Sequence, residues 1–277
     1  MIAALCALGA SIAWGVGDFL GGLKSRAVPL LLVLMLSQVS GFVGIGIVVA
    51  LAGNPPPDAS ILWASVAAVF GTLGLAAFYR GMAVGSMSVV APIAAVAAVV
   101  PVTFGIATGD DVSAPQVAGF ALALVGVALA SLERDHMGAA RVASGVPWAI
   151  VAVVGFGGYY VPMHEASEQD FLWAAFVFRG SVAAFALAAW VVLRPALAHA
   201  RGHLAAIALI GLADTAGNTL FAAAANQGEV SIVSVLATLY PVTTILLAAI
   251  VLDERVRRTQ RLGIVAALAG VVLISAG

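Results

Sequence analysis

Residues 119–131 read GFALALVGVALAS and residues 263–275 read GIVAALAGVVLIS, so two glycines and a serine recur at the same places in two apolar runs. Further matches follow in the same order along the chain: GTLGLAAFYRGMAVGS (71–86) with DTAGNTLFAAAANQGE (214–229), PVT at 101 with PVT at 241, and SQVS (37–40) with FRGS (178–181). The separation stays between 140 and 144 residues throughout. A repeat held at a nearly constant distance indicates duplication, so the fold is predicted to be one unit used twice.

The composition places both copies in a membrane. Of 277 residues, 63% are hydrophobic and 9% are charged, whereas soluble domains carry about 25% charged residues. A membrane-spanning helix needs about 20 largely apolar residues. Ten runs come close to this length: 3–23, 28–52, 59–82, 87–108, 114–132, 146–163, 170–194, 203–225, 230–252 and 259–276. The connections are short, so we predict an all-α integral membrane protein with five spans in residues 1–135 and five in residues 144–277.

The basic residues predict how the spans are oriented. With the loops numbered in order, eleven of the twelve lysines and arginines lie at odd-numbered loops: Lys24, Arg26, Arg80, Arg134, Arg141, Arg194, Arg201, Arg255, Arg257, Arg258 and Arg261. Loops rich in lysine and arginine stay in the cytoplasm. The odd-numbered loops are therefore predicted to be cytoplasmic and both termini to lie outside, in a multi-pass protein of the bacterial plasma membrane.

Because each copy holds an odd number of spans, the second copy must enter the membrane upside down relative to the first. The loop charges agree with this inversion. The first copy has KSR (24–26) after its first span, where the second copy has the acidic HEASEQD (164–170). Inverted repeats are the architecture of secondary transporters, whose substrate site lies at mid-membrane where the two copies meet.

Several stretches resemble the ten-helix EamA-type branch of the drug/metabolite transporter superfamily: ASIAWG (10–15), YPVTTILLAAIVLDER (240–255) and TQRLGIVAALAGVVLIS (259–275). The resemblance implies a membrane carrier, often an exporter of small metabolites. It also implies that spans one to four and six to nine surround a central cavity, with spans five and ten at the periphery. The first copy departs from the pattern, because GIATGDDVSAPQ (105–116) makes the stretch from Pro101 to Gln116 four residues shorter than its counterpart. Span four is therefore expected to end differently from span nine.

The strongest candidates for the cavity wall are polar residues inside the spans. At 1.5 Å per residue, Arg179 lies about 13 Å into span seven and Asp214 about 16 Å into the antiparallel span eight. A charge at the bilayer centre costs about 2.5–3.5 kcal/mol, so it should face the bundle interior and find a partner. Asn218 follows Asp214 by one turn, and Gln38 is the repeat counterpart of Arg179. We predict that these four residues line the cavity; alternatively, Arg179 and Asp214 only neutralise each other and join two helices.

Aromatic residues are further candidates for the wall. Trp14 lies in mid-span, and Asp18 follows it by one turn on the same helix face. The other aromatic candidates come from spans three, six and nine: Tyr79, Tyr159, Tyr160 and Tyr240. Helix packing explains a buried aromatic residue equally well, and an ion pair with Lys24 is the alternative for Asp18.

Prolines and glycines predict bends and close contacts. Pro101 and Pro241 hold matching positions in spans four and nine. Proline removes a backbone hydrogen bond and clashes with the preceding turn, so both are predicted to kink their spans, either as hinges or as fixed bends. Spans five and ten carry glycines seven residues apart: Gly119, Gly126, Gly263 and Gly270. Such a stripe favours helix packing; a dimer face is the alternative, and a monomer or weak homodimer is expected.

A secondary carrier fits these features best. It is predicted to export a small metabolite, amino-acid-like or otherwise polar or amphipathic, by alternating access; a passive facilitator or channel of the same fold is the alternative. Arg179 favours a substrate with a carboxylate, unless Asp214 neutralises it. The coupling stays open between pH-independent exchange and a proton carried by Asp18, Asp214 or Glu229. The expected partners are a small-molecule substrate and the lipid bilayer, with no nucleic acid. No enzyme activity, metal or cofactor is expected, because no span carries a nucleophile–base pair or a metal cluster and the chain has no nucleotide loop.

Overall fold

The computed structural model describes residues 2–98, 113–134, 140–167, 170–225, 239–254 and 256–276. The helices of the first copy are α1 (Ile2–Lys24), α2 (Leu30–Ala52), α3 (Trp63–Val84), α4 (Met87–Ala95) and α6 (Ala114–Ser131). Those of the second copy are α7 (Val146–Ser167), α8 (Phe171–Leu193), α9 (Leu204–Ala225), α11 (Tyr240–Leu252) and α12 (Arg258–Ala276). Each of the ten predicted apolar runs overlaps one of these helices, so the predicted all-helical membrane fold is confirmed.

Short elements join the helices. Three 3-10 turns are η1 (Ala59–Leu62), η2 (Val96–Ala98) and η3 (Leu197–His203). The connection between the two copies contains β1 (Leu132–Arg134) and β2 (Ala140–Val142), which pair antiparallel with Glu133 opposite Arg141. This hairpin was not predicted from the sequence.

Local chemistry determines where the long helices begin and end. Pro29 precedes α2, and Gly53 ends it at φ 69°, a left-handed conformation that glycine adopts without steric cost. The carboxylate of Asp170 accepts hydrogen bonds from the backbone N–H groups of Leu172 and Trp173 at the start of α8. It thereby satisfies two donors that lack partners within the helix.

The packing of the helices follows the inversion. Exchanging the copies turns the pair α1–α9 into α7–α3, and both pairs pack closely. The same exchange relates α2–α9 to α8–α3 and α1–α11 to α7–α4, and these also pack together. The pairs α2–α8, α4–α11 and α6–α12 join a helix to its own counterpart. This is the pattern that a two-fold axis in the membrane plane produces.

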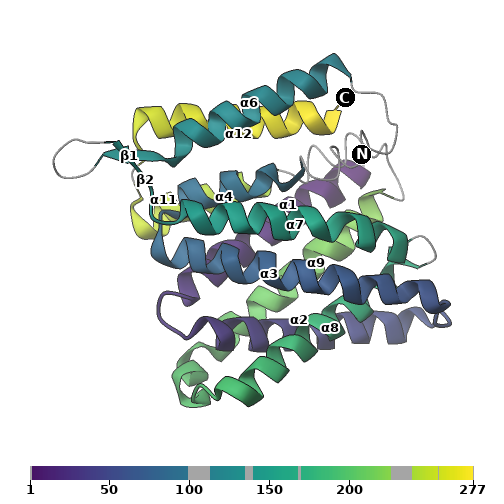
Figure 1. The fold of residues 1–277 in the computed structure, drawn as a ribbon. Helices are drawn as coiled ribbons and strands as arrows, with labels where there is room; N and C mark the ends of the chain where they lie inside the picture. The colour runs from purple at the N-terminus through teal and green to yellow at the C-terminus, as the bar shows by residue number, and fades with distance from the viewer. Residues whose placement is uncertain are drawn as a thin grey trace.

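The glycine stripes join α6 to α12, which form a separate layer at the top of Figure 1. A Cβ on Gly126 would lie 2.7 Å from both Gly263 O and Ala267 Cα. A Cβ on Gly270 would lie 2.6 Å from Gly119 O and 2.5 Å from Ala123 N. Gly126 of α6 therefore packs on the backbone of α12, and its repeat counterpart Gly270 of α12 packs on the equivalent backbone of α6. Since this intramolecular contact occupies the stripe, it does not form a free dimer face.

Loop contacts show which helix ends lie together. Asn54, in the second loop, donates to Asp170, in the sixth, over 2.6 Å. Arg26, in the first loop, binds Gly85 O in the third loop and Glu254 in the ninth. The second and sixth loops therefore share one end of the bundle, the even-loop end, and the first, third and ninth loops share the other, the odd-loop end. In Figure 1 the odd-loop end is on the left and both termini are on the right.

The outer surface of the bundle is apolar. Large side chains such as Leu51, Val192 and Ile250 are 83%, 79% and 78% exposed, which suits a surface covered by lipid. Five described helices are long and apolar enough by themselves to cross a membrane: 2–24, 30–52, 63–84, 171–193 and 197–221. Shorter apolar helices cover 114–129, 146–159 and 240–252.

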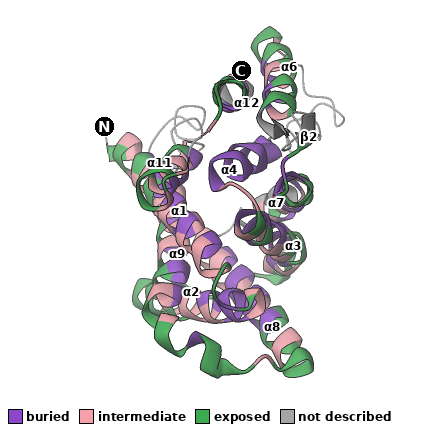
Figure 2. Cartoon of the chain, turned by 90° about the vertical axis from the view of Figure 1, so that its left-hand side faces the viewer, coloured by how far each residue is buried: buried purple, intermediate pink, exposed green. Residues whose placement is uncertain are grey.

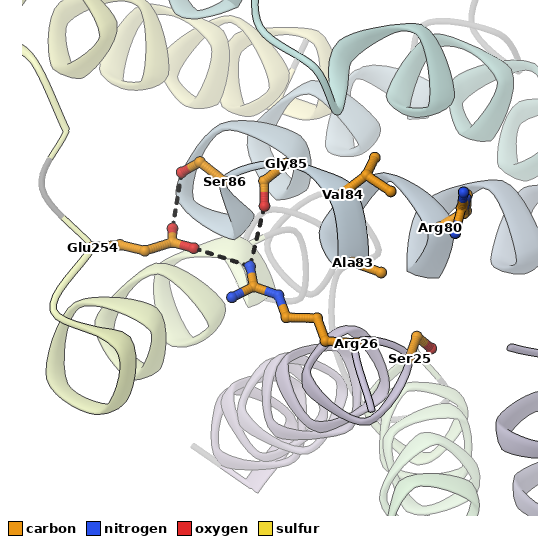
Figure 3. Close-up of a pocket in the computed structure, with 8 residues that line it drawn as sticks. All are labelled: Ser25, Arg26, Arg80, Ala83, Val84, Gly85, Ser86 and Glu254. Atoms are coloured by element: carbon orange, nitrogen blue, oxygen red, sulfur yellow. Dashed lines mark hydrogen bonds and ion pairs between the residues drawn. The ribbon is translucent and has the colours of Figure 1, made fainter. Parts of the chain in front are cut away.

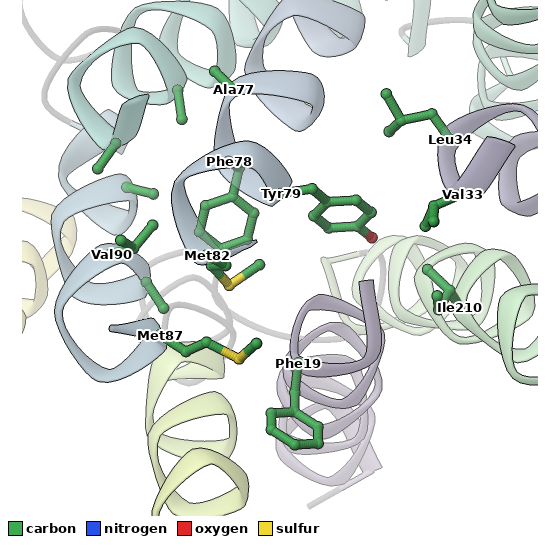
Figure 4. Close-up of a cluster of buried hydrophobic side chains, with 14 of the residues drawn as sticks. Phe19, Val33, Leu34, Ala77, Phe78, Tyr79, Met82, Met87, Val90 and Ile210 are labelled. Atoms are coloured by element: carbon green, nitrogen blue, oxygen red, sulfur yellow. The ribbon is translucent and has the colours of Figure 1, made fainter. Parts of the chain in front are cut away.

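The buried core is concentrated at the odd-loop end. There, one hydrophobic cluster joins α1, α2, α3, α4, α7, α8, α9 and α11. Figure 4 shows part of this cluster, with Phe78, Tyr79 and Met82 on α3, Met87 on α4 and Phe19 on α1. At the even-loop end, the described residues form two separate clusters, one of α3, α7 and α8 and the other of α1 and α9. Among the described residues, the two halves of the bundle are therefore held together mainly at one end.

Candidate functional site

A cavity of about 170 Å³ lies at mid-height, that is, between the two ends of the bundle, on the even-loop side of the large core cluster. Both copies contribute to it, through α1 to α4 of the first copy and α7, α8, α9 and α11 of the second, and no described residue of α6 or α12 lines it. Eight of the ten residues predicted for the wall line this cavity: Trp14, Asp18, Gln38, Tyr159, Arg179, Asp214, Asn218 and Tyr240. The sequence therefore predicted which residues meet here; what they bind is a separate question.

Arg179 is the centre of the polar wall. Its side chain is 3% exposed, and Nη1 forms an ion pair with Asp214 Oδ2 at 2.5 Å. The same nitrogen donates a hydrogen bond of 2.8 Å to Oε1 of Gln38, its repeat counterpart. Nη2 is buried and has no hydrogen-bond partner in the described part of the chain. Arg179 favoured a substrate with a carboxylate only if Asp214 did not neutralise it. Because Asp214 does pair with Arg179, that argument for a carboxylate substrate no longer holds.

Two aromatic residues that correspond in the repeat both line the cavity. The Trp14 ring of α1 packs on Gly217 of α9, where a Cβ would lie 2.5 Å from the ring, and its Nε1 donates to Asn218 Oδ1. Phe156 of α7, 142 residues later, packs in the same way on Gly74 of α3. Asn218 therefore bonds to Trp14 rather than joining the Arg179 ion pair.

Further rings complete the apolar wall. Trp14 lies edge-on to Tyr240 with the centroids 6.4 Å apart. Tyr159 and Phe178 contact each other in the same manner at 5.1 Å. Four helices, α1, α7, α8 and α11, thus supply aromatic rings to one small space.

Asp18 lines the cavity but forms no ion pair with Lys24 in the described structure. It lies one residue beyond Gly17, where α1 touches the backbone of Ile210 and Asp214. This contact brings the two carboxylates, Asp18 and Asp214, within electrostatic range of each other. The alternative of a Lys24 ion pair is not what the structure shows.

Tyr79 was also predicted for the wall, but it lies in the core cluster on the odd-loop side of the cavity rather than on its wall. It is 1% exposed, and its ring packs on Gly21 of α1 at the odd-loop end. Of the two prolines, Pro241 lies in the first turn of α11, where a missing N–H breaks no helical bond. Pro101 lies outside the described residues, as does Glu229, so the hinge prediction remains a prediction. The side chain of Tyr160 is also outside the described part.

A second polar network closes the odd-loop end, and sequence reasoning missed it (Figure 3). The carboxylate of Glu254 accepts hydrogen bonds from the Ser86 hydroxyl and from the backbone N–H groups of Met87 and Ser88 at the start of α4. It also pairs with Arg26 at 3.3 Å, and Arg26 in turn donates to the carbonyl of Met82 at the end of α3. One side chain from each copy therefore ties α1, α3, α4 and α11 together.

This network shifts the acidity of Glu254. Partial burial by itself raises the pKa of the carboxyl. The donors from Ser88, Ser86 and Met87 outweigh burial and hold the pKa below its ordinary value of 4.5, because each of them stabilises the charged form. Glu254 is thus a carboxylate held in its ionised state at the end of the bundle.

Two aromatic residues of the cavity wall were also missed by sequence reasoning. Phe156 had a signal, because it is the repeat counterpart of Trp14. Phe178 had a weaker one, because it precedes Arg179, and the arginine carbon Cζ lies 5.6 Å from its ring centroid. No comparable sequence signal pointed to Glu254, which lies in a charged loop.

The profile of the EamA-like transporter family matches the chain twice, over residues 1–132 and residues 143–276. The chain belongs to the EamA-like transporter family. Both copies of the duplicated unit are thus recognised separately, as the resemblance in the sequence indicated.

A solved structure described only as "Crystal structure of protein" has the same fold as this EamA-like transporter. The two chains are 16% identical with a TM-score of 0.65, over 98% of this chain and 95% of the other. At that identity the similarity shows the fold alone. No curated protein sequence matches the chain. Membership of the family establishes a multi-pass membrane transporter of small solutes rather than an enzyme.

Proposed function

We propose that this EamA-like protein is a secondary carrier that exports a small polar or amphipathic solute by alternating access. The solute occupies the mid-height cavity, and the bundle opens alternately at its two ends. Alternating access in inverted-repeat carriers comes from one repeat rocking against the other around a fixed site. The observation that carries the proposal is a break in the two-fold pattern of helix packing.

That break separates two equivalent helix pairs. At the odd-loop end α1 packs on α3, with Gly21 against Tyr79 and Gly22 against Met82. The equivalent pair, α7 and α9, makes no comparable contact within the described residues. Two copies of one unit therefore adopt different arrangements at the two ends. This supports two interchangeable states in which the closed end and the less closely packed end exchange roles.

The closed end is the one that the basic residues predict to be cytoplasmic. With that orientation, the structure corresponds to a state closed to the cytoplasm, and the Arg26–Glu254 network is part of the closure. The export direction is taken from the resemblance to the family, whose members are often exporters.

Exchange across proteoliposome membranes tests this proposal. Purified protein is reconstituted and loaded with candidate solutes: amino acids, sugars and amines, with and without a pH gradient. A carrier accelerates uptake of labelled solute when unlabelled solute is present inside, because the loaded site returns faster than the empty one. Equal uptake with and without internal solute would indicate a channel and refute alternating access.

Orientation needs its own measurement. A reporter fused to the C-terminus, active only outside the cytoplasm, should give a signal, and the same reporter inserted between β1 and β2 should give none. The opposite pattern would reverse the assignment of the closed end.

A further inference from the structure

The charges that face the cavity do not balance. Three charged side chains line it: Asp18, Arg179 and Asp214. Arg179 and Asp214 form an ion pair and cancel. Asp18 has no ion-pair or hydrogen-bond partner in the part of the chain that the structure describes. With all three ionised, the described lining therefore carries one uncompensated negative charge.

This negative charge lies in an environment that does not compensate it. The titratable groups near Asp18 are Asp214 of α9 and Tyr79 of α3, and Arg179 of α8 lies near both of these. The single cation among them is bound to the other carboxylate. An isolated charge away from water is unfavourable, and either a proton on the carboxylate or an opposite charge beside it removes the penalty. A cationic ligand supplies that charge.

The walls favour the same kind of ligand. Five aromatic rings line the cavity with Asp18: Trp14, Phe156, Tyr159, Phe178 and Tyr240. The faces of such rings attract ammonium groups, and the rings also pack against apolar bodies. The cavity measures about 170 Å³, and a cavity of about 150 Å³ is enough for benzene. A ring of that size with a short amine therefore suits the space.

A second unsatisfied group points to the same ligand. Arg179 Nη2 is buried without a partner on the cavity wall, and a buried donor is usually hydrogen-bonded. A neutral acceptor suits it, such as a hydroxyl, ether or carbonyl oxygen, because Asp214 already provides the anion. A carboxylate placed here would meet the field of two aspartates.

We propose that the cavity binds a small protonated amine with an aromatic or apolar body, with Asp18 as its counter-ion. This inference rests on the proposed function, because it names the substrate class of that same site.

Binding to purified protein in detergent tests it with three probes that share one body. Phenethylamine, phenylalanine and 3-phenylpropionate carry net charges of about +1, 0 and −1 at neutral pH and differ little in the ring and chain. Phenethylamine is expected to bind at least tenfold more tightly than either of the others, measured by calorimetry. Tighter binding of phenylalanine or 3-phenylpropionate, or no binding of phenethylamine, would overturn the proposal.

Variants assign the effect to the residue. Asp18→Asn should weaken phenethylamine binding at least tenfold, and Asp18→Glu should largely retain it. Asp253→Asn is the matched control. Asp253 ends α11 outside the cavity at φ 49°, a conformation that asparagine tolerates, so affinity should not change. If Asp18→Asn binds the amine as tightly as the unmodified protein, Asp18 is not the counter-ion.

Failure of this inference differs from failure of the proposed function. Amine binding without accelerated exchange in proteoliposomes leaves the site assigned and refutes the carrier mechanism. Accelerated exchange of zwitterions or anions without that of amines supports the carrier and refutes the assignment of the substrate class.

Discussion

Replacing Gly21 by alanine should open the odd-loop end of the bundle. A Cβ at this position would lie 2.5 Å from Cε1 and Cε2 of Tyr79 and closer still to Cζ. The ring is 1% exposed, so it has little room to move, and α1 must separate from α3. Overpacking of this kind costs about 1–3 kcal/mol. If that free energy falls only on the closed arrangement, the ratio of closed to open states changes by about 5- to 150-fold.

Spin labels at Ala27 and Arg80 measure this change. Both positions are exposed, one follows α1 and the other lies near the end of α3, and a Cys6→Ser background removes the chain's single cysteine. Gly21→Ala should shift the distance distribution towards longer values. Gly17→Ala is the control one turn earlier on the same helix, because its Cβ would find its nearest neighbour at an ordinary 3.5 Å.

A rescue variant separates the clash from general damage. Tyr79→Leu removes the ring atoms that the new Cβ would meet, so the double variant Gly21→Ala/Tyr79→Leu should recover the short distance. The reasoning is refuted if Gly21→Ala gives the same distribution as the unmodified protein, or if the double variant opens as far as the single one.

Three further outcomes are expected. Arg179→Gln should lower the yield of folded protein more than a double variant that adds Asp214→Asn, since breaking a buried ion pair costs about 3–5 kcal/mol; size-exclusion profiles measure this, and equal yields contradict it. Because the pKa of Glu254 is lowered on folding, its contribution to stability is complete above pH 4.5 and is lost as the pH falls through the folded value. The melting temperature of the unmodified protein should therefore fall more between pH 5 and pH 3 than that of Glu254→Gln, and parallel curves would contradict this. Gly126→Val should lower the melting temperature by several degrees, because the added atoms meet the backbone of Ala267, and an unchanged melting temperature would show that the α6–α12 contact is looser than described.

The sequence was sufficient for the helices and for most of the cavity wall. Ten apolar runs predicted ten helices because span length in a membrane is set by bilayer thickness. The proximity of Gln38 to Arg179 could be predicted from the sequence, because equivalent positions of an inverted repeat meet near its axis. The place of Asp214 beside Arg179 could be predicted because a charge inside a span needs a partner.

Other features could not be predicted because they depend on how helices rotate and close. Tyr79 was expected on the cavity wall, but its ring packs on Gly21 of α1, on the odd-loop side of the cavity. The sequence around residue 79 does not indicate this contact, because Gly21 belongs to another helix. The Glu254 network brings together groups from the two copies that are 168 residues apart, as in its bond to Ser86. Three-residue strands such as β1 and β2 leave no periodicity long enough to detect.

The pairing of α6 with α12 has a consequence for how such a protein arose. If the present chain descends from a single five-helix unit, the contact of Gly126 with Ala267, mirrored by Gly270 with Ala123, once joined two separate polypeptides. A gene divided between the codons for β1 and β2 would again produce two separate polypeptides of five helices each. Its two products, made in the same cell, should find each other in the bilayer through this seam of glycine and backbone.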